Sequence, residues 1–231
     1  QIIALINREV VPAIGCTEPI AVALCVAKAT ETLGCRPEKI QALLSANILK
    51  NAMGVGIPGT GMIGLPIAIA LGALIGKSEN QQEVLKDSTP EAVEEGKKLI
   101  DSQIINIGLK YGIEEKLYIE IICEAGGNKA TAIISGGHTN FVYVSFNDEV
   151  LVNKQSTTSR ETETEDVTLS LRKVYDFAVT TPIEELKFIL ETRNLNKKAA
   201  ERSFKGNYGH QLGKTLNSKK NENLMMGDNT F

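Results

Sequence analysis

The chain has 231 residues and 42% of them are hydrophobic, so it can bury a substantial core as one large domain or two small ones. Its 25 Lys and Arg residues nearly balance 28 Asp and Glu residues, which leaves a net charge of −3, and it contains no Trp. This composition provides no basic face for nucleic acid and argues against an aromatic platform for single strands.

The sequence shows no signal-peptide pattern and begins at Gln1, so we expect a cytoplasmic protein that is a processed or engineered piece. Residues 51–76 carry no charge and could suggest a membrane span, but Pro58, Pro66 and several glycines interrupt them. The helical part, 65–75, would be about 16 Å long, roughly half of a bilayer core. We therefore predict a buried helix of a soluble protein and no membrane partner.

Apolar residues at helical spacing predict a short helix over 2–10 and a longer one over 17–33. For the longer helix, Thr17 suits the N-cap, Pro19 suits the first turn and Gly34 suits the end. Its first half is apolar on every side, which indicates burial.

A strand is predicted over 40–46, followed by a glycine-rich loop over 47–64 that leads into the helix over 65–75. An amphipathic helix is predicted over 89–100, with a proline at its start. Segments that alternate or are rich in Ile, Val and Tyr predict antiparallel strands over 104–109, 116–123, 129–135 and 140–146. The sequence EAGGNK between two of them is typical of a hairpin turn.

The composition changes near the C-terminus. Residues 153–166, NKQSTTSRETETED, contain no aliphatic or aromatic side chain and predict a solvated linker. Helical spacing returns over 167–179 and 183–193, whereas 214–231 lose periodicity. We expect an α+β fold, with helices packed on an antiparallel β-sheet in a domain spanning residues 1–152, and a polar linker and helical segment over 153–231.

Four cysteines form no C-x-x-C pair, and Cys16 directly precedes the predicted helix 17–33. The positive end of the helix dipole and the free backbone N–H groups favour a thiolate, the form that attacks and binds metals. The alternative is a small buried hydrophobe, and the residues alone leave both interpretations open. Cys25 lies roughly 180° around the helix and is predicted to be core. The same structural role is expected for Cys35 and Cys123.

Glu18 lies in the first turn of the same helix. Its ordinary role would be to complement the helix dipole. Beside a thiolate, it is also a candidate for an acid or base, or for a group that binds an ammonium ion.

The sequence PGTGMIG contains three glycines with the spacing of a dinucleotide-binding fingerprint. The proline before the first glycine and the lack of a parallel βαβ unit argue against that function. A glycine-rich turn that opens a helix still presents backbone N–H groups to an anion. Gly59, Thr60 and Gly61 are therefore candidates for binding a substrate carboxylate, with close backbone packing as the alternative.

Further polar residues are candidates for substrate contacts. Asn47, Lys50 and Asn51 precede the glycine-rich turn and could supply side-chain donors, and Thr17 lies at the predicted helix start. His138 follows two glycines between two β segments, where a bulge would direct the imidazole off the sheet. A lone histidine is more often structural, so both roles stay open for it.

Four blocks together resemble the N-terminal half of the L-cysteine desulfidase family, relatives of the iron–sulfur L-serine dehydratases: PAIGCTEPIAVAL, SANILKNAMGVGIPGTGMIGLPIAIALGAL, GGHTN and GNYGHQLGKTL. The resemblance spans nearly the whole chain. It implies a pyridoxal-independent lyase that converts L-cysteine to pyruvate, ammonia and sulfide, using an oxygen-sensitive 4Fe–4S cluster held by three cysteines. It also implies that Cys16 is one cluster ligand, while an open iron acts as a Lewis acid and a protein base removes the α-proton.

The family's other two cluster cysteines belong to a C-terminal half that does not match this sequence. We therefore expect these 231 residues to hold no intact cluster and to have little or no activity. The expected partners are an amino-acid substrate and the missing C-terminal domain, and a homo-oligomer is left open. Glu18 and His138 are the catalytic candidates. The alternatives are an L-serine dehydratase-like lyase and a non-catalytic domain that binds an amino acid or another small anion.

Overall fold

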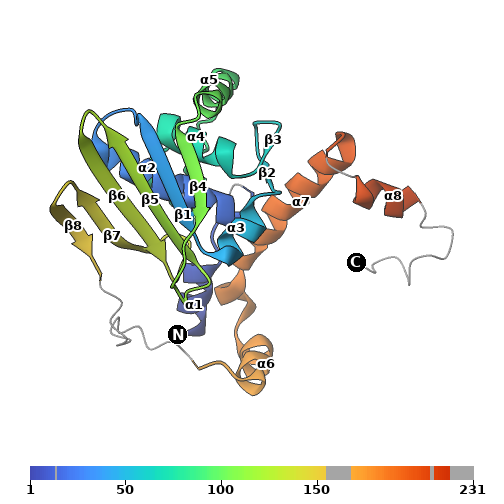
Figure 1. Ribbon diagram of the computed structural model, residues 1–231. Helices are drawn as coiled ribbons and strands as arrows, with labels where there is room; N and C mark the ends of the chain where they lie inside the picture. Colours follow the sequence, from blue (N-terminus) through green and yellow to red (C-terminus); the bar gives the residue numbers. More distant parts are fainter. Residues whose placement is uncertain (14, 155–167, 209–210, 219–231) are drawn as a thin grey trace. The chain divides into compact units, whose positions relative to one another are not determined.

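The structure is a computed structural model that describes residues 1–13, 15–154, 168–208 and 211–218 (Figure 1). The chain divides into two compact units. The larger unit is Pro12–Glu163, and the smaller one joins Gln1–Val11 with Thr164–Phe231. The N-terminal helix therefore groups with the C-terminal helices, whereas the sequence-based division at residue 152 places it with the sheet.

The larger unit has an α+β fold, as predicted. Its elements in chain order are α2 (Thr17–Leu33), β1 (Lys39–Leu44), α3 (Ala46–Ala52), β2 (Gly56–Ile57), β3 (Met62–Ile63), α4 (Leu65–Ile75), the 3-10 helix η1 (Ser78–Glu83), α5 (Pro90–Asp101), β4 (Ile105–Leu109), β5 (Tyr118–Ala125), β6 (Asn128–Ser135), β7 (Phe141–Phe146) and β8 (Glu149–Asn153).

A six-stranded sheet has the order β4-β1-β5-β6-β7-β8. The predicted antiparallel pairing is confirmed for β5, β6 and β7, and β1 also pairs antiparallel with β5. It is wrong for β4, which pairs parallel with β1 through Ile40 and Ile105. The chain between these two strands contains two long helices, and a crossover of that length returns a strand in the same direction.

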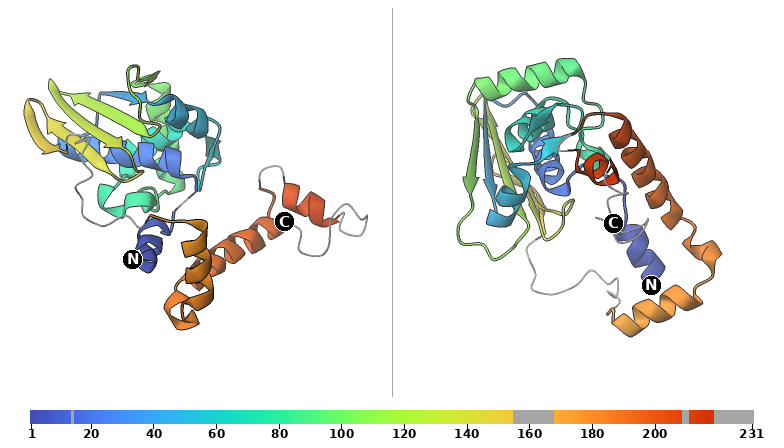
Figure 2. Two further views of the ribbon diagram at one scale, coloured as in Figure 1. Left: turned by 90° about the horizontal axis from the view of Figure 1, so that it is seen from below. Right: turned by 90° about the vertical axis from the view of Figure 1, so that its right-hand side faces the viewer.

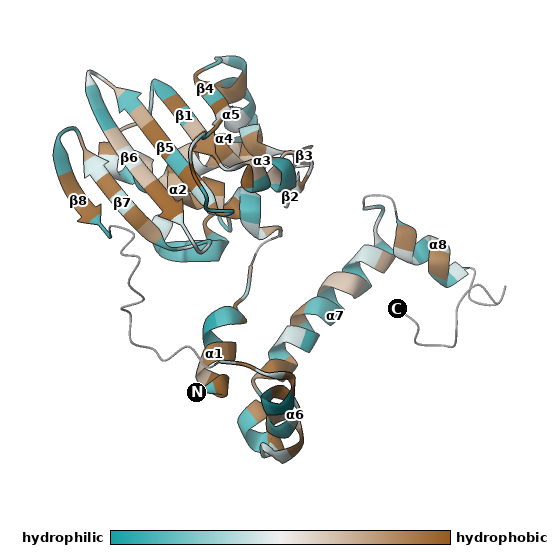
Figure 3. Ribbon diagram, turned by 60° about the horizontal axis from the view of Figure 1, so that its bottom comes forward, coloured by the Kyte–Doolittle hydropathy of each residue, from teal (hydrophilic) through white to brown (hydrophobic). Residues whose placement is uncertain are grey.

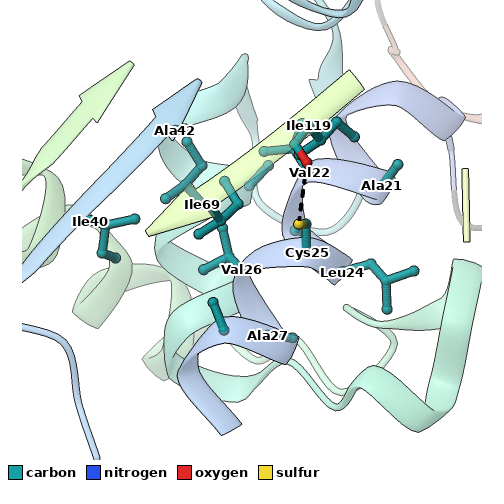
Figure 4. Close-up of a cluster of buried hydrophobic side chains, with 14 of the residues drawn as sticks. Ala21, Val22, Leu24, Cys25, Val26, Ala27, Ile40, Ala42, Ile69 and Ile119 are labelled. Atoms are coloured by element: carbon teal, nitrogen blue, oxygen red, sulfur yellow. Dashed lines mark hydrogen bonds between the residues drawn. The ribbon is translucent and has the colours of Figure 1, made fainter. Parts of the chain in front are cut away.

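Helices α2 and α4 lie on the same side of the sheet (Figure 2). In β5, buried and half-buried residues alternate, and the buried residues face these helices. The side chain of Cys25 is fully buried in this layer (Figure 4) and its thiol donates to the carbonyl oxygens of Ala132, at 3.3 Å, and Ile119, at 3.8 Å. The prediction that Cys25 belongs to the core is confirmed.

The two central helices have the bounds expected from the sequence, Thr17–Leu33 and Leu65–Ile75. The residue that occupies the N-cap of α2 is Cys16 rather than Thr17, and Gly34 ends the helix with a φ of 77°. A left-handed residue at this position is the common way to end a helix, and glycine adopts it without steric cost.

The segment 47–64 is not a loop, which corrects the prediction. Ser45 caps α3 by accepting a hydrogen bond from the Ile48 amide, and the chain then forms the small β2–β3 hairpin. The predicted strand over 40–46 ends earlier, at Leu44, because Ser45 already belongs to the helix cap.

The turn between β5 and β6 is the hairpin expected from EAGGNK, with Gly126 and Gly127 both at positive φ. Strand β8 was not predicted. It pairs with β7 next to Asn147, which has a φ of 49°. The start of the predicted linker over 153–166 therefore belongs to the sheet, and its residues 155–166 lie outside the described part of the chain.

The smaller unit contains helices with no buried residue: α1 (Ile2–Glu9), α6 (Leu171–Thr180), the 3-10 helix η2 (Ile183–Leu186), α7 (Ile189–Lys205) and α8 (Leu212–Ser218). The helix predicted over 183–193 is divided between η2 and the much longer α7. The segment 214–231, predicted to lack periodicity, begins within α8, and 219–231 lie outside the described residues. Within the described chain, no helix is long and apolar enough to span a membrane.

Candidate functional site

The start of helix α2 places a thiol and a carboxylate in direct contact. Cys16 is the N-cap residue, with an extended backbone at φ −69° and ψ 133°. Its Sγ donates a hydrogen bond to Oε2 of Glu18 over 2.9 Å. Both side chains are partly buried. The two residues singled out from the GCTEP sequence are therefore bonded to one another.

The Glu18 carboxylate is the centre of this site because three side chains donate to it. Cys16 and Thr17 donate to Oε2, the latter at 3.2 Å, and Asn51 donates to Oε1 through Nδ2 at 3.3 Å. These hydrogen bonds, that of Cys16 first, lower the pKa of Glu18, and partial burial opposes them. The arrangement therefore favours an ionised carboxylate held on both oxygens.

The pKa of the Cys16 thiol shifts in the opposite direction to the one that a helix start alone would give. Burial, followed by the hydrogen bond to Glu18, raises the pKa of Cys16 above its ordinary value. Backbone hydrogen bonds at the helix start lower this pKa, as expected, but the neighbouring carboxylate and the loss of solvent outweigh them. The raised pKa favours the protonated thiol in this structure, and the role of Cys16 as a metal ligand stays a prediction.

Close contacts hold the start of α2 against the β2–β3 hairpin and the start of α4 against the end of α3. Gly15 has a φ of 84°, and a Cβ atom there would lie 2.8 Å from Cγ of Pro58. Gly64, which caps α4, would place a Cβ atom 2.6 Å from the carbonyl oxygen of Met53. Both positions lack room for a side chain, so glycine is required for this packing. Among the glycines of PGTGMIG, the close-packing alternative therefore holds at Gly64, whereas a Cβ atom at Gly59 or Gly61 would meet nothing within 4 Å.

Of the three polar residues expected in a loop, Asn51 reaches the site. All three lie on helix α3, with Asn47 one turn before Asn51. Asn47 and Lys50 are exposed, and among the described residues neither side chain has a hydrogen-bonded partner. Asn51 lies on the side of α3 nearest α2 and donates to Glu18.

The glycine-rich segment leads into α4 as predicted, with its third glycine, Gly64, as the N-cap, but its other two glycines lie away from the helix start. Gly59 and Gly61 lie at the exposed tip of the β2–β3 hairpin, with φ values of 80° and 66°, and α4 starts further along. The Thr60 hydroxyl donates to the Ile57 carbonyl at 2.6 Å and accepts from the Met62 amide at 3.0 Å. These bonds stabilise the turn and leave the Thr60 hydroxyl little capacity for a ligand.

His138 lies in the turn between β6 and β7 and is partly buried. The sequence suggested a bulge at this histidine, but the register shift of this strand pair lies between Ile133 and Ile134, within β6. Both β1 and β6 pair with β5. This pairing places the C-terminal end of β1, which leads into α3, at the same end of the strands as Ser135. No hydrogen bond among the described residues joins His138 to Glu18, so its role stays a prediction.

The described residues offer one cysteine suited to a metal at this site. They contain no group of three or more His, Cys, Asp or Glu side chains that could hold a metal ion. Cys25 and Cys123 are buried, and burial raises the pKa of both thiols. Cys35 is exposed, unlike the buried residue expected, and it follows the opposite end of α2. The donor set therefore fits one ligand position rather than a complete cluster.

His210, in the fourth sequence block that resembles the desulfidase family, lies outside the described residues. The blocks containing GCTEP and the glycine-rich segment, which are far apart in the sequence, are in contact in the structure through Glu18 and Asn51 and through Gly15 and Pro58.

The chain is similar to UPF0597 proteins. One from Phocaeicola vulgatus is 77% identical over 231 residues, which is 100% of this chain and 54% of the relative. One from Parabacteroides distasonis is 55% identical over 234 residues, again 54% of the relative, and one from Clostridium perfringens is 38% identical over 223 residues, 52% of the relative. The chain thus spans about half the length of the curated relatives it matches. No protein-family model and no solved structure matches it.

Proposed function

We propose that this chain supplies one part of the active site of a pyridoxal-independent iron–sulfur lyase that converts L-cysteine to pyruvate, ammonia and sulfide. The observation that carries the proposal is the Glu18 carboxylate, which contacts the Cys16 thiol on one side and Asn51 on the other. The resemblance of the same segments to cysteine desulfidases gives the reaction.

Cys16 is the proposed cluster ligand contributed by this chain. A partly buried thiol at a helix start suits a metal ligand, because backbone N–H groups there stabilise the sulfur once it loses its proton. The additional chain of the relatives is the proposed source of the other ligands. When bound, an iron–sulfur cluster with an open iron supplies Lewis acidity for the departing β-substituent.

Glu18 is the proposed binding group for the substrate ammonium. As a metal ligand, Cys16 Sγ would carry no proton and would no longer donate to Glu18 Oε2. Glu18 Oε2 would then have a lone pair free to accept a charge-assisted hydrogen bond from an amino group. Asn51 and Thr17 keep the carboxylate oriented meanwhile. His138 remains the candidate for the base that removes the α-proton.

The test uses the full-length protein, or the Phocaeicola vulgatus relative, expressed and purified under anaerobic conditions. We expect the visible absorbance of an iron–sulfur cluster and release of sulfide and pyruvate from L-cysteine. Cys16→Ser should lose both, whereas Cys35→Ser should keep both because Cys35 follows the other end of α2. A reconstituted protein with neither absorbance nor sulfide release would rule out the lyase.

Two other outcomes identify the alternatives. Faster pyruvate formation from L-serine than from L-cysteine would assign the same machinery to a serine dehydratase, since hydroxide and sulfide would leave from the same position. Tight binding of an amino acid that survives Cys16→Ser, without any turnover, would instead identify a non-catalytic binding domain.

A further inference from the structure

Helix α6 exposes a continuous apolar face, which we call the α6 stripe. Its members recur at the spacing of one helix face, and all are exposed: Leu171, Val174, Tyr175, Ala178 and Val179. Leu171 is 88% exposed and Val179 is 61% exposed. The polar side of the same helix carries an ion pair between Arg172 and Asp176. Figure 3 shows hydrophobic and hydrophilic residues side by side along this helix.

The described residues of the smaller unit do not bury this face. None of its described helices contains a buried residue. α6 has 10 residues, and isolated helices shorter than about 12–15 residues are only marginally stable in water. The stability of such a helix comes mainly from packing of its apolar face, so a surface that covers the stripe would stabilise α6.

We propose that the α6 stripe is the docking surface for the additional chain present in the full-length relatives. This chain covers 54% of the Phocaeicola vulgatus relative, so nearly as much sequence again is available to cover the stripe. The proposal concerns how the protein is assembled, and it does not depend on the lyase reaction.

The size of the stripe favours a covalently connected partner over a second copy. A helix of this length is about 15 Å long and about 10 Å wide, so its face covers roughly 150 Å². Stable interfaces between separate proteins bury roughly 800 Å² on each partner. A segment of the same polypeptide needs far less area, because the connection gives it a high effective concentration.

The test compares cysteine probes on the two sides of α6. Ala178→Cys lies in the stripe, and Lys173→Cys is the matched control about 140° around the helix, at about 100° per residue. Both positions are exposed, so neither substitution disturbs a packed residue of the described chain. Maleimide labelling is followed at each site by peptide mass spectrometry, which separates the probe from the native thiols.

In the native full-length protein, we expect labelling of Ala178→Cys to be at least about tenfold slower than that of Lys173→Cys, and in the 231-residue chain we expect similar rates. Equal rates in the full-length protein would overturn the proposal. Protection already present in the 231-residue chain would place the partner within this chain and would also overturn it. Protection that disappears on dilution, together with loss of a dimer, would show a second copy instead.

Discussion

The contact between Gly15 and Pro58 makes Gly15→Ala the most informative substitution near the site. Gly15 has a φ of 84°, and a Cβ atom would lie 2.8 Å from the Pro58 ring. Gly34, at the other end of α2, provides the control because its φ is 77° and a Cβ atom there meets nothing within 4 Å. Both substitutions carry the same backbone cost, and one of them adds a steric contact.

The expected magnitudes follow from these two terms. A left-handed conformation costs a non-glycine residue about 1–2 kcal/mol, which is the whole effect expected for Gly34→Ala. Overpacking adds about 1–3 kcal/mol, so Gly15→Ala should destabilise the larger unit by that much more. With an m-value of about 2 kcal/mol per M of urea, a difference of about 2 kcal/mol separates the two midpoints by about 1 M.

Urea unfolding followed by circular dichroism measures this difference, and the double variant Gly15→Ala/Pro58→Ala identifies its source. Removing most of the Pro58 ring should bring the midpoint of the double variant close to that of Gly34→Ala, after allowance for Pro58→Ala alone. If Gly15→Ala were no more destabilising than Gly34→Ala, or if Pro58→Ala gave no rescue, the contact would not hold the α2 start against the hairpin.

The remaining predictions concern the side chains around the site and in the core. Asn51→Ala removes a donor to Glu18, so the pKa of Glu18 should rise, and carbon-detected NMR titration of the carboxyl group measures it. Glu18→Gln removes a negative charge and an acceptor, so the pKa of Cys16 should fall and its alkylation at neutral pH should be faster, with exposed Cys35 unchanged as the internal control. Burial raises the pKa of Cys123 from 9.0 to about 12, so the folded state binds this proton more tightly than the unfolded state. The associated stability is complete below the unfolded pKa and is lost as the pH rises from about 9 to about 12, at up to about 1.4 kcal/mol per pH unit. Urea midpoints measured from pH 8 upward should therefore fall less steeply in Cys123→Ala than in the wild type.

The features that the sequence predicts well are those determined by neighbouring residues. Helices 17–33 and 65–75 have their ends at glycine and proline signals and are apolar around most of their circumference. The Gly126–Gly127 turn follows directly from the requirement for positive φ at two successive residues. Such local signals do not depend on which strands become neighbours.

The features that were missed depend on partners distant in the sequence or on competing local signals. The parallel pairing of β4 with β1 is set by the crossover that α4 and α5 make, not by the residues of β4. In α3, the Ser45 cap and the buried pair Ile48 and Ala52 do have helical spacing, but the following glycines favoured a loop. For the unpredicted strand β8, the available signal was Asn147, because asparagine tolerates the positive φ that the β7–β8 turn requires.

The candidate site was predicted in composition rather than in geometry. The sequence placed Cys16 at a helix start and Glu18 beside it, and both positions are correct. It did not give the sign of the Cys16 pKa shift, because two opposing effects act on the thiol and their balance depends on burial and on the carboxylate rotamer. That Asn51 rather than Lys50 reaches Glu18 follows from α3, which had not been predicted.

The burial of α2 explains how a small side-chain cluster can be held in one place. Residues Pro19 to Ala27 are all buried, and Gly72 of α4 approaches so closely that a Cβ atom there would lie 2.6 Å from the Ala23 carbonyl oxygen. A helix packed this tightly has little freedom to shift or rotate, because interiors are close-packed and transmit displacement. The first turn, with Cys16 and Glu18, is therefore held in place by the packed core. The contact between Gly15 and Pro58 also holds the residue before this turn in place. A site that must align a thiol and a carboxylate with groups from another part of the protein needs one of its sides to be held rigidly.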